Sequence, residues 1–234
     1  MRANRDREGI DEPMAALQAV LFDGDGTLID TEGIILTSMR YTVNELHGME
    51  ASDEELMAGV GTPLPAQMLH FAGGDEALAE QLVDEYRAHN DRIHDEAIGA
   101  FVDTREALEL LRDAGYRMGV VTSKRHEMAA RGLELSGIDE FFEVLVAPDD
   151  WPEHKPAPGP IRYACELMGV DPQASMYVGD SPYDIQAGNA AGCATVAALW
   201  GMFPKAVLAA EHPTMMRSSL LELARELTEG TLAP

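Results

Sequence analysis

Five short runs of apolar and β-branched residues recur along the chain, and segments with helical periodicity separate them. They are AVLF at 19–22, RMGVVT at 117–122, FEVLVA at 142–147, SMYVG at 175–179 and ATVAAL at 194–199. Apolar runs without polar alternation are typical of strands buried on both faces, as in a parallel sheet. Parallel neighbours need helical crossovers, so this order predicts an α/β fold with a doubly wound, Rossmann-like parallel sheet.

The helical segments between these runs carry recognisable boundaries. In 103–115, Asp103 is expected to cap a helix in a capping box with Glu106, and Gly115 is expected to end it. The segment 160–169 begins with a proline and ends with a glycine, which are the usual residues at these two helix positions. Both segments fit the crossover helices of the predicted sheet.

One long stretch, 31–99, breaks the alternation because it shows helical periods only. Ser52 and Glu55 have the spacing of a capping box, and the glycines and prolines of 58–65 indicate a loop. We therefore predict a helical cap at 31–99, inserted into a Rossmann-like core formed by 15–30 and 100–234. Residues 1–14 are predicted to be a disordered tail.

Composition and charge exclude several classes of partner. The 234 residues include 41 acidic and 17 basic side chains, a net charge of −24, which repels nucleic acid and anionic membrane surfaces. No run approaches the ~18 apolar residues of a membrane span. Cys165 and Cys193 lack CxxC spacing and are expected to be reduced, buried thiols. These features predict a cytoplasmic protein, monomeric or dimeric, that binds neither nucleic acid nor membrane.

Polar and charged residues gather where the predicted strands end. In an open α/β sheet, ligands bind outside the carboxyl ends of the strands. The candidates at that edge are Asp23, Asp25, Thr122, Ser123, Lys124, Lys155, Asp180 and Asp184.

Several carboxylates can share a small space only when a cation or a proton compensates them, so an oxygen-coordinated Mg²⁺ is the natural occupant. The lysines would repel Mg²⁺, but a phosphoryl group between metal and lysine satisfies both signs. DGDG could alternatively be an ordinary turn. A calcium loop counted from Asp23 fails, because its sixth and twelfth positions are Leu28 and Ile34 rather than Gly and Glu.

The segments DGDGTLID, VVTSK, HKPAPGP and VGDSPYDIQAGNAAG resemble, in order and approximate spacing, the four signature motifs of the haloacid dehalogenase-like superfamily. The helical insertion resembles the cap that members carry between the first and second motifs. The likeness spans roughly 17–228. It implies phosphoryl transfer through an aspartyl-phosphate, with Mg²⁺ as cofactor.

The resemblance assigns a role to each motif residue. It implies that Asp23 is the nucleophile and that Asp25 is the general acid and then the base. It also implies that the Asp23 carboxylate, the Asp25 backbone carbonyl and Asp180 hold Mg²⁺, while Asp184 acts on the metal site indirectly or through water.

The same likeness predicts the phosphate contacts and the reaction class. Thr122, Ser123 and Lys155 would bind phosphoryl oxygens, and Lys124 is a further candidate for phosphate or substrate contact. The presence of Asp25 disfavours dehalogenation, and Thr27 favours phosphatases over sugar-phosphate mutases, which more often carry valine. Gly24 departs from the pattern, because relatives often have a bulky apolar residue there.

Substrate identity is expected to depend on the cap. AGVGTPL resembles a cap loop that meets the active site in phosphoglycolate-phosphatase-like and pyrophosphatase-like members, which makes Gly61 and Thr62 candidate substrate contacts. Candidate polar contacts from the cap helices are Arg40, His89, Asn90 and His94.

The substrate stays open among a phosphosugar, phosphoglycolate, a nucleotide-like or secondary-metabolite phosphate, and pyrophosphate. Other segments, such as EYRAHNDRIHDE, look closest to bacterial pyrophosphatases. The alternatives are a sugar phosphomutase of the β-phosphoglucomutase kind and a non-catalytic protein whose acidic rim binds a metal or a partner.

Overall fold

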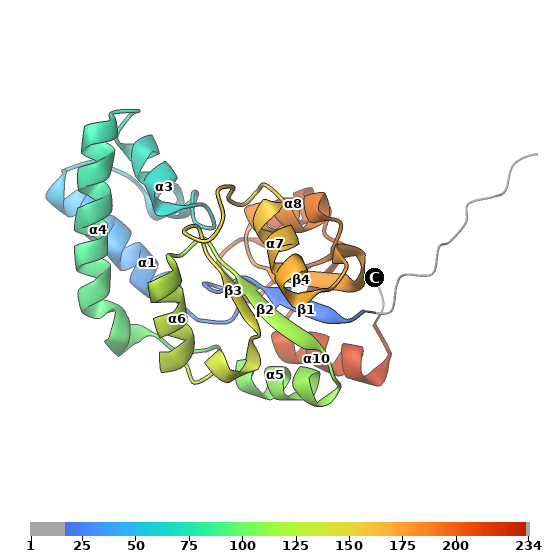
Figure 1. The fold of residues 1–234 in the computed structure, drawn as a ribbon. Coiled ribbons are helices and arrows are strands. Elements are labelled where there is room, and N and C mark those ends of the chain that lie inside the picture. Colours follow the sequence, from blue (N-terminus) through green and yellow to red (C-terminus); the bar gives the residue numbers. More distant parts are fainter. Residues whose placement is uncertain (1–16, 233–234) are drawn as a thin grey trace, which may run out of the picture.

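A parallel sheet lies at the centre of the computed structural model, which describes residues 17–232 (Figure 1). Within those residues it has six strands in the order β3-β2-β1-β4-β5-β6, all paired in parallel. They are β1 (Ala19–Phe22), β2 (Arg117–Val121), β3 (Val144–Val146), β4 (Ser175–Gly179), β5 (Ala194–Ala198) and β6 (Met215–Arg217). The doubly wound, Rossmann-like α/β fold is thereby confirmed. The predicted tail, 1–14, lies outside the described residues.

All five strands expected from sequence are present, and the sixth was missed. β6 is three residues long and pairs only with β5, where Met215 lies opposite Val196. A strand of that length at the edge of a sheet carries too few residues to show a periodic pattern.

Helices cover both faces of the sheet, with α5 and α10 on one side and α7 and α8 on the other (Figure 1). Successive strand residues point to opposite faces, so Val20 and Phe22 join the cluster with α5 and α10, whereas Ala19 and Leu21 join the cluster with α7 and α8. The helices of this part are α5 (Thr104–Asp113), α6 (His126–Leu135), α7 (Gly159–Met168), α8 (Pro182–Ala191), α9 (Lys205–Ala210) and α10 (Leu220–Glu229).

Most predicted helix ends are found, with one correction. Gly169 ends α7 in the left-handed conformation, and Ser52 and Glu55 form the expected capping box. The capping box of Asp103 with Glu106 is wrong, because the Asp103 side chain makes no capping hydrogen bond. Its backbone, at φ −96° and ψ 0°, is not in the extended conformation from which a capping side chain reaches the first turn.

The chain between β1 and α5 is helical, and we call residues 32–97 the helical segment. It contains α1 (Glu32–Met39), a π-helical stretch (Arg40–Leu46), α2 (Asp53–Met57), α3 (Leu64–Phe71) and α4 (Glu76–Ala97). Figure 1 shows α1, α3 and α4 together beside the sheet rather than on either face of it. These helices share an apolar cluster of their own, which includes Met39, Leu56 and Leu82. That separate cluster is compatible with the predicted cap at 31–99, which stays a prediction.

Both cysteines are buried and form no disulfide. In the part of the chain that the structure describes, no helix has the length and apolar character needed to cross a membrane.

Candidate active site

The carboxyl ends of three neighbouring strands bring the polar residues together. Phe22, the last residue of β1, pairs with Val120 of β2 and with Val178 of β4. The residues that follow these strands, Asp23 and Asp180 among them, therefore meet at one edge of the sheet. This is the convergence that the sequence predicts.

Lys155 lies at the centre of this group and is almost completely buried. Its Nζ donates hydrogen bonds to Oδ1 of Asp23 and Oδ1 of Asp184, both at 2.7 Å, and to the Tyr177 hydroxyl at 3.2 Å. Burial by itself would lower the pKa of Lys155, but the charges of Asp184 and Asp23 outweigh it and raise that pKa. Lys155 is thus a fixed cation that holds the Asp23 carboxylate in place.

Asp184 supports Lys155 from the first turn of α8. Its Oδ2 accepts hydrogen bonds from the backbone N–H of Ser181 at 3.0 Å and from the Ser181 hydroxyl at 2.5 Å, which completes a capping box. Its Oδ1 accepts from Lys155 and from the Tyr177 hydroxyl. Protein donors thus contact both oxygens of Asp184, so this carboxylate is placed to position Lys155.

Asp180 is held where two glycine backbones approach it closely. Its Oδ1 accepts a hydrogen bond from the Thr27 hydroxyl at 3.3 Å, and its Oδ2 accepts from the backbone N–H of Met202 at 2.8 Å. A Cβ on Gly26, whose φ is +79°, would lie 2.3 Å from Oδ2 of Asp180, and one on Gly201 would lie 2.2 Å from its Cβ. Both positions therefore need glycine for Asp180 to occupy this place.

Three buried carboxylates, those of Asp23, Asp180 and Asp184, have oxygen atoms within 4.8 Å of one another. Lys155 is the cation bonded to this cluster among the described residues, so with all three carboxylates ionised two negative charges would lack a compensating positive charge. Burial raises the pKa of Asp23 to about 7 despite the opposing charge of Lys155, and it raises the pKa of Asp180 well above its usual range. A divalent cation would supply the two missing positive charges.

Asp25 stands apart from this cluster and has its own cation. Its Oδ1 accepts a hydrogen bond from Nζ of Lys124 at 3.0 Å, and both side chains are partly buried. The backbone N–H of Lys124 donates to the Thr122 hydroxyl at 3.1 Å within the segment after β2, so the Lys124–Asp25 pair joins the ends of β1 and β2. The candidate acid is therefore oriented independently of the Lys155 group.

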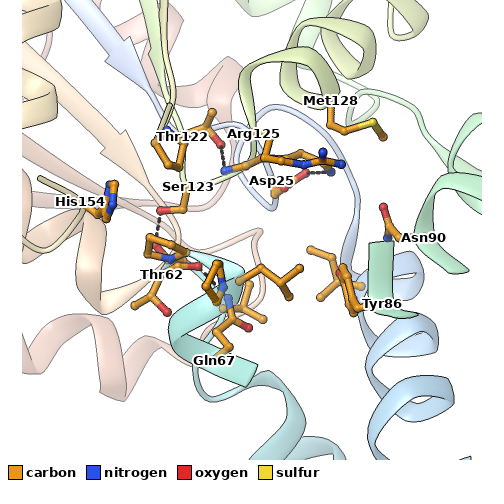
Figure 2. Close-up of a pocket in the computed structure, with 18 of the residues that line it drawn as sticks. Asp25, Thr62, Gln67, Tyr86, Asn90, Thr122, Ser123, Arg125, Met128 and His154 are labelled. Carbon is orange, nitrogen blue, oxygen red and sulfur yellow. Dashed lines mark hydrogen bonds and ion pairs between the residues drawn. The ribbon is translucent and has the colours of Figure 1, made fainter. Parts of the chain in front are cut away.

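A cavity of about 390 Å³ opens above these residues, between the sheet edge and the helical segment. Figure 2 shows Asp25, Thr122 and Ser123 on one side of it and Thr62, Gln67, Tyr86 and Asn90 on the other. Asp23, Asp180, Lys124 and Gly61 also line it. The structure thus brings most of the predicted residues together around one space, to which Gln67 and Tyr86 are additions that the sequence did not predict.

The loop with Gly61 and Thr62 is fastened to the sheet edge. Ser123 donates its hydroxyl proton to the Gly61 carbonyl at 2.6 Å, so this hydroxyl joins loop and core in the structure. Gly61 has a φ of +98°, and a Cβ there would lie 2.6 Å from the Ser181 Oγ. The Thr62 hydroxyl donates to the Gly59 carbonyl and so shapes the loop itself.

Three other predicted contacts lie elsewhere. The described residues that line the cavity do not include Arg40, His89 or His94. Arg40 forms an exposed ion pair with Asp53, and His89 stacks on Tyr41 with ring centroids 4.2 Å apart. His94 is fully buried, with Nδ1 3.2 Å from a carboxylate oxygen of Asp95.

The residues of α4 that do line the cavity are Tyr86, Arg87, Asn90 and Asp91. Of these, Asn90 was expected. Arg87 was missed, as was Arg125 at the start of α6. The signal that could have found Arg87 is its i, i+3 spacing to Asn90, which places the two on one helix face.

The structure gives no steric reason for a glycine at position 24, where relatives often have a bulky apolar residue. A Cβ there would meet Oγ1 of Thr122 at 3.5 Å, an ordinary van der Waals contact. Alanine would therefore fit at this position.

A parallel sheet whose strand ends carry two aspartates, a Thr-Ser pair, a buried lysine and a further aspartate defines a class of α/β hydrolases, and sequence comparison agrees. The family model described as Haloacid dehalogenase-like hydrolase matches residues 20–198, so the chain belongs to this family and is a hydrolase of that type.

Individual relatives are similar over nearly their whole length. The pyrophosphatase PpaX of Bacillus cereus strain AH820 is 34% identical over 213 residues, 91% of this chain and 97% of the relative. That of Bacillus velezensis is 35% identical over 205 residues, 88% of this chain and 94% of the relative. A solved structure described as a predicted phosphoglycolate phosphatase from Haemophilus somnus is 25% identical, with a TM-score of 0.78 and coverage of 91% and 98%.

Proposed function

We propose that this chain is a Mg²⁺-dependent phosphohydrolase that removes phosphate from a small phosphorylated compound through an aspartyl-phosphate. The observation that carries the proposal is the buried Asp23 carboxylate, which Lys155 holds at 2.7 Å beside the buried carboxylates of Asp180 and Asp184. Family membership and the relatives named as pyrophosphatases support it.

Asp23 would be the nucleophile. Lys155 bonds its Oδ1, which favours the ionised carboxylate against the effect of burial and orients it toward the cavity that Asp23 lines. As the Asp23 oxygen bonds to phosphorus, the bond from phosphorus to the leaving oxygen breaks on the opposite side. Thr122 and Lys155 would contact the phosphoryl oxygens during this step.

Asp25 would move the protons. As an acid it donates a proton to the leaving oxygen, and as a carboxylate it then takes one from the water that attacks phosphorus. That attack breaks the bond between phosphorus and Asp23, which releases phosphate and restores the free carboxylate. The hydrogen bond from Lys124 orients Asp25 for both steps.

The carboxylate cluster fits Mg²⁺ by charge and by donor type. Asp23, the backbone carbonyl of Asp25 and Asp180 would hold the ion, which when bound neutralises the nucleophile and the phosphoryl oxygens. Asp184 would act by fixing Lys155. A helical cap at 31–99, a cytoplasmic location and a monomeric or dimeric state complete the proposal from sequence.

The test is phosphate release from pyrophosphate, phosphoglycolate, sugar phosphates and nucleoside monophosphates, each with Mg²⁺ and with chelator. We expect release with Mg²⁺ only. Isomerised sugar phosphate without free phosphate would point to a mutase instead. Silence across the panel in folded protein would favour a non-catalytic metal-binding or partner-binding role.

The nucleophile is tested by Asp23→Asn, which should abolish release while the protein stays folded by circular dichroism. The matched control is Asp30→Asn, an exposed aspartate in the same loop that does not line the cavity. Substantial activity in Asp23→Asn would rule out the aspartyl-phosphate.

A further inference from the structure

Two arginines without a carboxylate partner line the cavity from different elements. Arg87 comes from α4 of the helical segment, and Arg125 precedes α6 at the sheet edge. Within residues 17–232, neither guanidinium makes a hydrogen bond or an ion pair. The proposed reaction uses neither of them.

The lack of an ion-pair partner is unusual in a chain whose 41 acidic side chains outnumber its 17 basic ones. Most described arginines are paired with one. Those in ion pairs are Arg40, Arg105, Arg112, Arg117, Arg131, Arg217 and Arg225. Lys124, the neighbour of Arg125, is likewise paired with Asp25. Arg87 and Arg125 therefore leave positive charge in the cavity that the protein does not neutralise by direct contact.

The burial of Arg87 costs free energy of folding that a bound ligand would recover. Its Nε is buried and has no hydrogen-bond partner in the described structure. Burial lowers the pKa of Arg87, and repulsion from Arg125 lowers it further. Asp84 and Asp91 oppose this effect, but neither lies within ion-pair distance. A buried donor without a partner is destabilising unless a ligand accepts its proton.

The two arginines line the same cavity as Asp25. Arg125 follows Lys124, whose Nζ bonds Asp25, the proposed proton donor to the leaving oxygen. In Figure 2 the Arg125 side chain runs beside Asp25 toward the side of the pocket where Asn90 lies. Arg87 is three residues before Asn90 on α4, so it approaches the same region from the helical segment.

We propose that Arg87 and Arg125 together bind a second anionic group, carried by the leaving part of the substrate. The substrates would then be small compounds in which a phosphate or a carboxylate lies close to the scissile phosphoryl group. Guanidinium groups suit this task because their planar set of donors matches phosphate and carboxylate oxygens in pairs. This inference rests on the proposed function and adds the chemical class of the substrate to it.

The experiment compares three substrates that share the phosphoryl group. The leaving group of pyrophosphate is a phosphate, and the leaving group of phosphoglycolate carries a carboxylate. The substrate p-nitrophenyl phosphate has no second anionic group. We expect Arg87→Gln and Arg125→Gln to lower kcat/KM for pyrophosphate or phosphoglycolate by roughly 10- to 100-fold more than for p-nitrophenyl phosphate, mainly through KM. The substrate whose kcat/KM falls more shows whether the two arginines bind a phosphate or a carboxylate. Arg87→Lys should recover part of the lost kcat/KM.

The matched control is Arg92→Gln, which removes the same charge from an exposed position on α4. The Arg92 guanidinium lies over the Tyr41 ring and does not line the cavity. It should leave the ratio between the substrates unchanged. Equal losses on all three substrates in Arg87→Gln and Arg125→Gln, or no loss, would overturn the inference.

A binding measurement separates failure of this inference from failure of the proposed function. Asp23→Asn is titrated calorimetrically with imidodiphosphate, which has two phosphate groups, and with methylphosphonate, which has one. Adding Arg87→Gln or Arg125→Gln should weaken imidodiphosphate binding at least about tenfold more than methylphosphonate binding. Unchanged imidodiphosphate binding in these double variants would overturn the inference even if no substrate turns over.

Discussion

Nζ of Lys124 lies 3.0 Å from Oδ1 of Asp25, and this pair joins the ends of β1 and β2 at the mouth of the cavity. The residues are 99 positions apart in the chain. Lys124, a candidate for phosphate or substrate contact, lines the cavity and is also bonded to the proposed acid. A substitution of Lys124 can therefore test whether this lysine orients Asp25 or binds substrate.

Lys124→Gln should lower kcat by roughly 10- to 100-fold with a smaller change in KM, because Asp25 loses the cation that orients it while the phosphoryl contacts remain. Steady-state kinetics on the best substrate of the panel measure the split. The matched control is Lys205→Gln, an exposed lysine at the start of α9, which should behave like the unaltered protein. A rise in KM at constant kcat would show that Lys124 binds substrate.

Gly61→Ala should separate the loop that contains Gly61 and Thr62 from the sheet edge. A Cβ at Gly61 would lie 2.6 Å from Oγ of Ser181, and the φ of +98° is unfavourable for alanine. We expect kcat/KM to fall by about tenfold or more, because the loop lines the cavity beside the proposed catalytic residues.

The control for this variant is Gly33→Ala on α1, where no atom lies within 4 Å of the added carbon. This change should keep activity and leave the Tm equal or slightly higher, because alanine favours a helix. Full activity in Gly61→Ala would show that the contact between this loop and the sheet edge is not needed for activity.

The metal-free protein should lose stability as the pH rises. Burial raises the pKa of Asp23 from 3.8 to about 7, so between these values the folded state binds more protons than the unfolded state. The free energy of unfolding therefore falls with rising pH across that window. Thermal melts in chelator should show that Tm falls between pH 5 and pH 8. This fall should be larger by roughly 5 °C in the unaltered protein than in Asp23→Asn.

Mg²⁺ should reverse this trend, because the cation competes with protons for the same carboxylates. The increase in Tm caused by Mg²⁺ should grow from pH 5 to 8 and should be much smaller in Asp23→Asn. Parallel melting curves for the two proteins, with or without Mg²⁺, would show that Asp23 does not belong to a cation site.

Local patterns were sufficient for the architecture apart from the short edge strand β6. The apolar run of β1 and the aspartate that follows it are adjacent in the chain, so the place of Asp23 at a strand end could be predicted. The same reasoning placed Thr122 after β2 and Asp180 after β4. Parallel strand ends share one edge of a sheet, which made their convergence predictable as well.

Local patterns failed where packing chooses between equivalent options. The periodicity of α4 shows a helix but does not show which face meets the cavity. Arg87 and Asn90 lie on that face, whereas His89 and His94, which looked equally suitable, contact other parts of the helical segment. The prediction that Asp103 caps a helix was wrong for a similar reason, because the residue type does not determine the backbone conformation that a cap requires.

By itself, the sequence determined the order of strands and helices, the residues at each strand end and the excess of carboxylates that calls for a cation, because these depend on neighbours in the chain and on composition. The tertiary structure decided which charges pair. Lys155 meets Asp23 across 132 positions and Asp184 across 29, while Lys124 takes Asp25. It also left Arg87 and Arg125 facing the cavity without a carboxylate partner in the described chain. Pairing energies depend on distance and burial in space, and only the folded chain sets those two quantities.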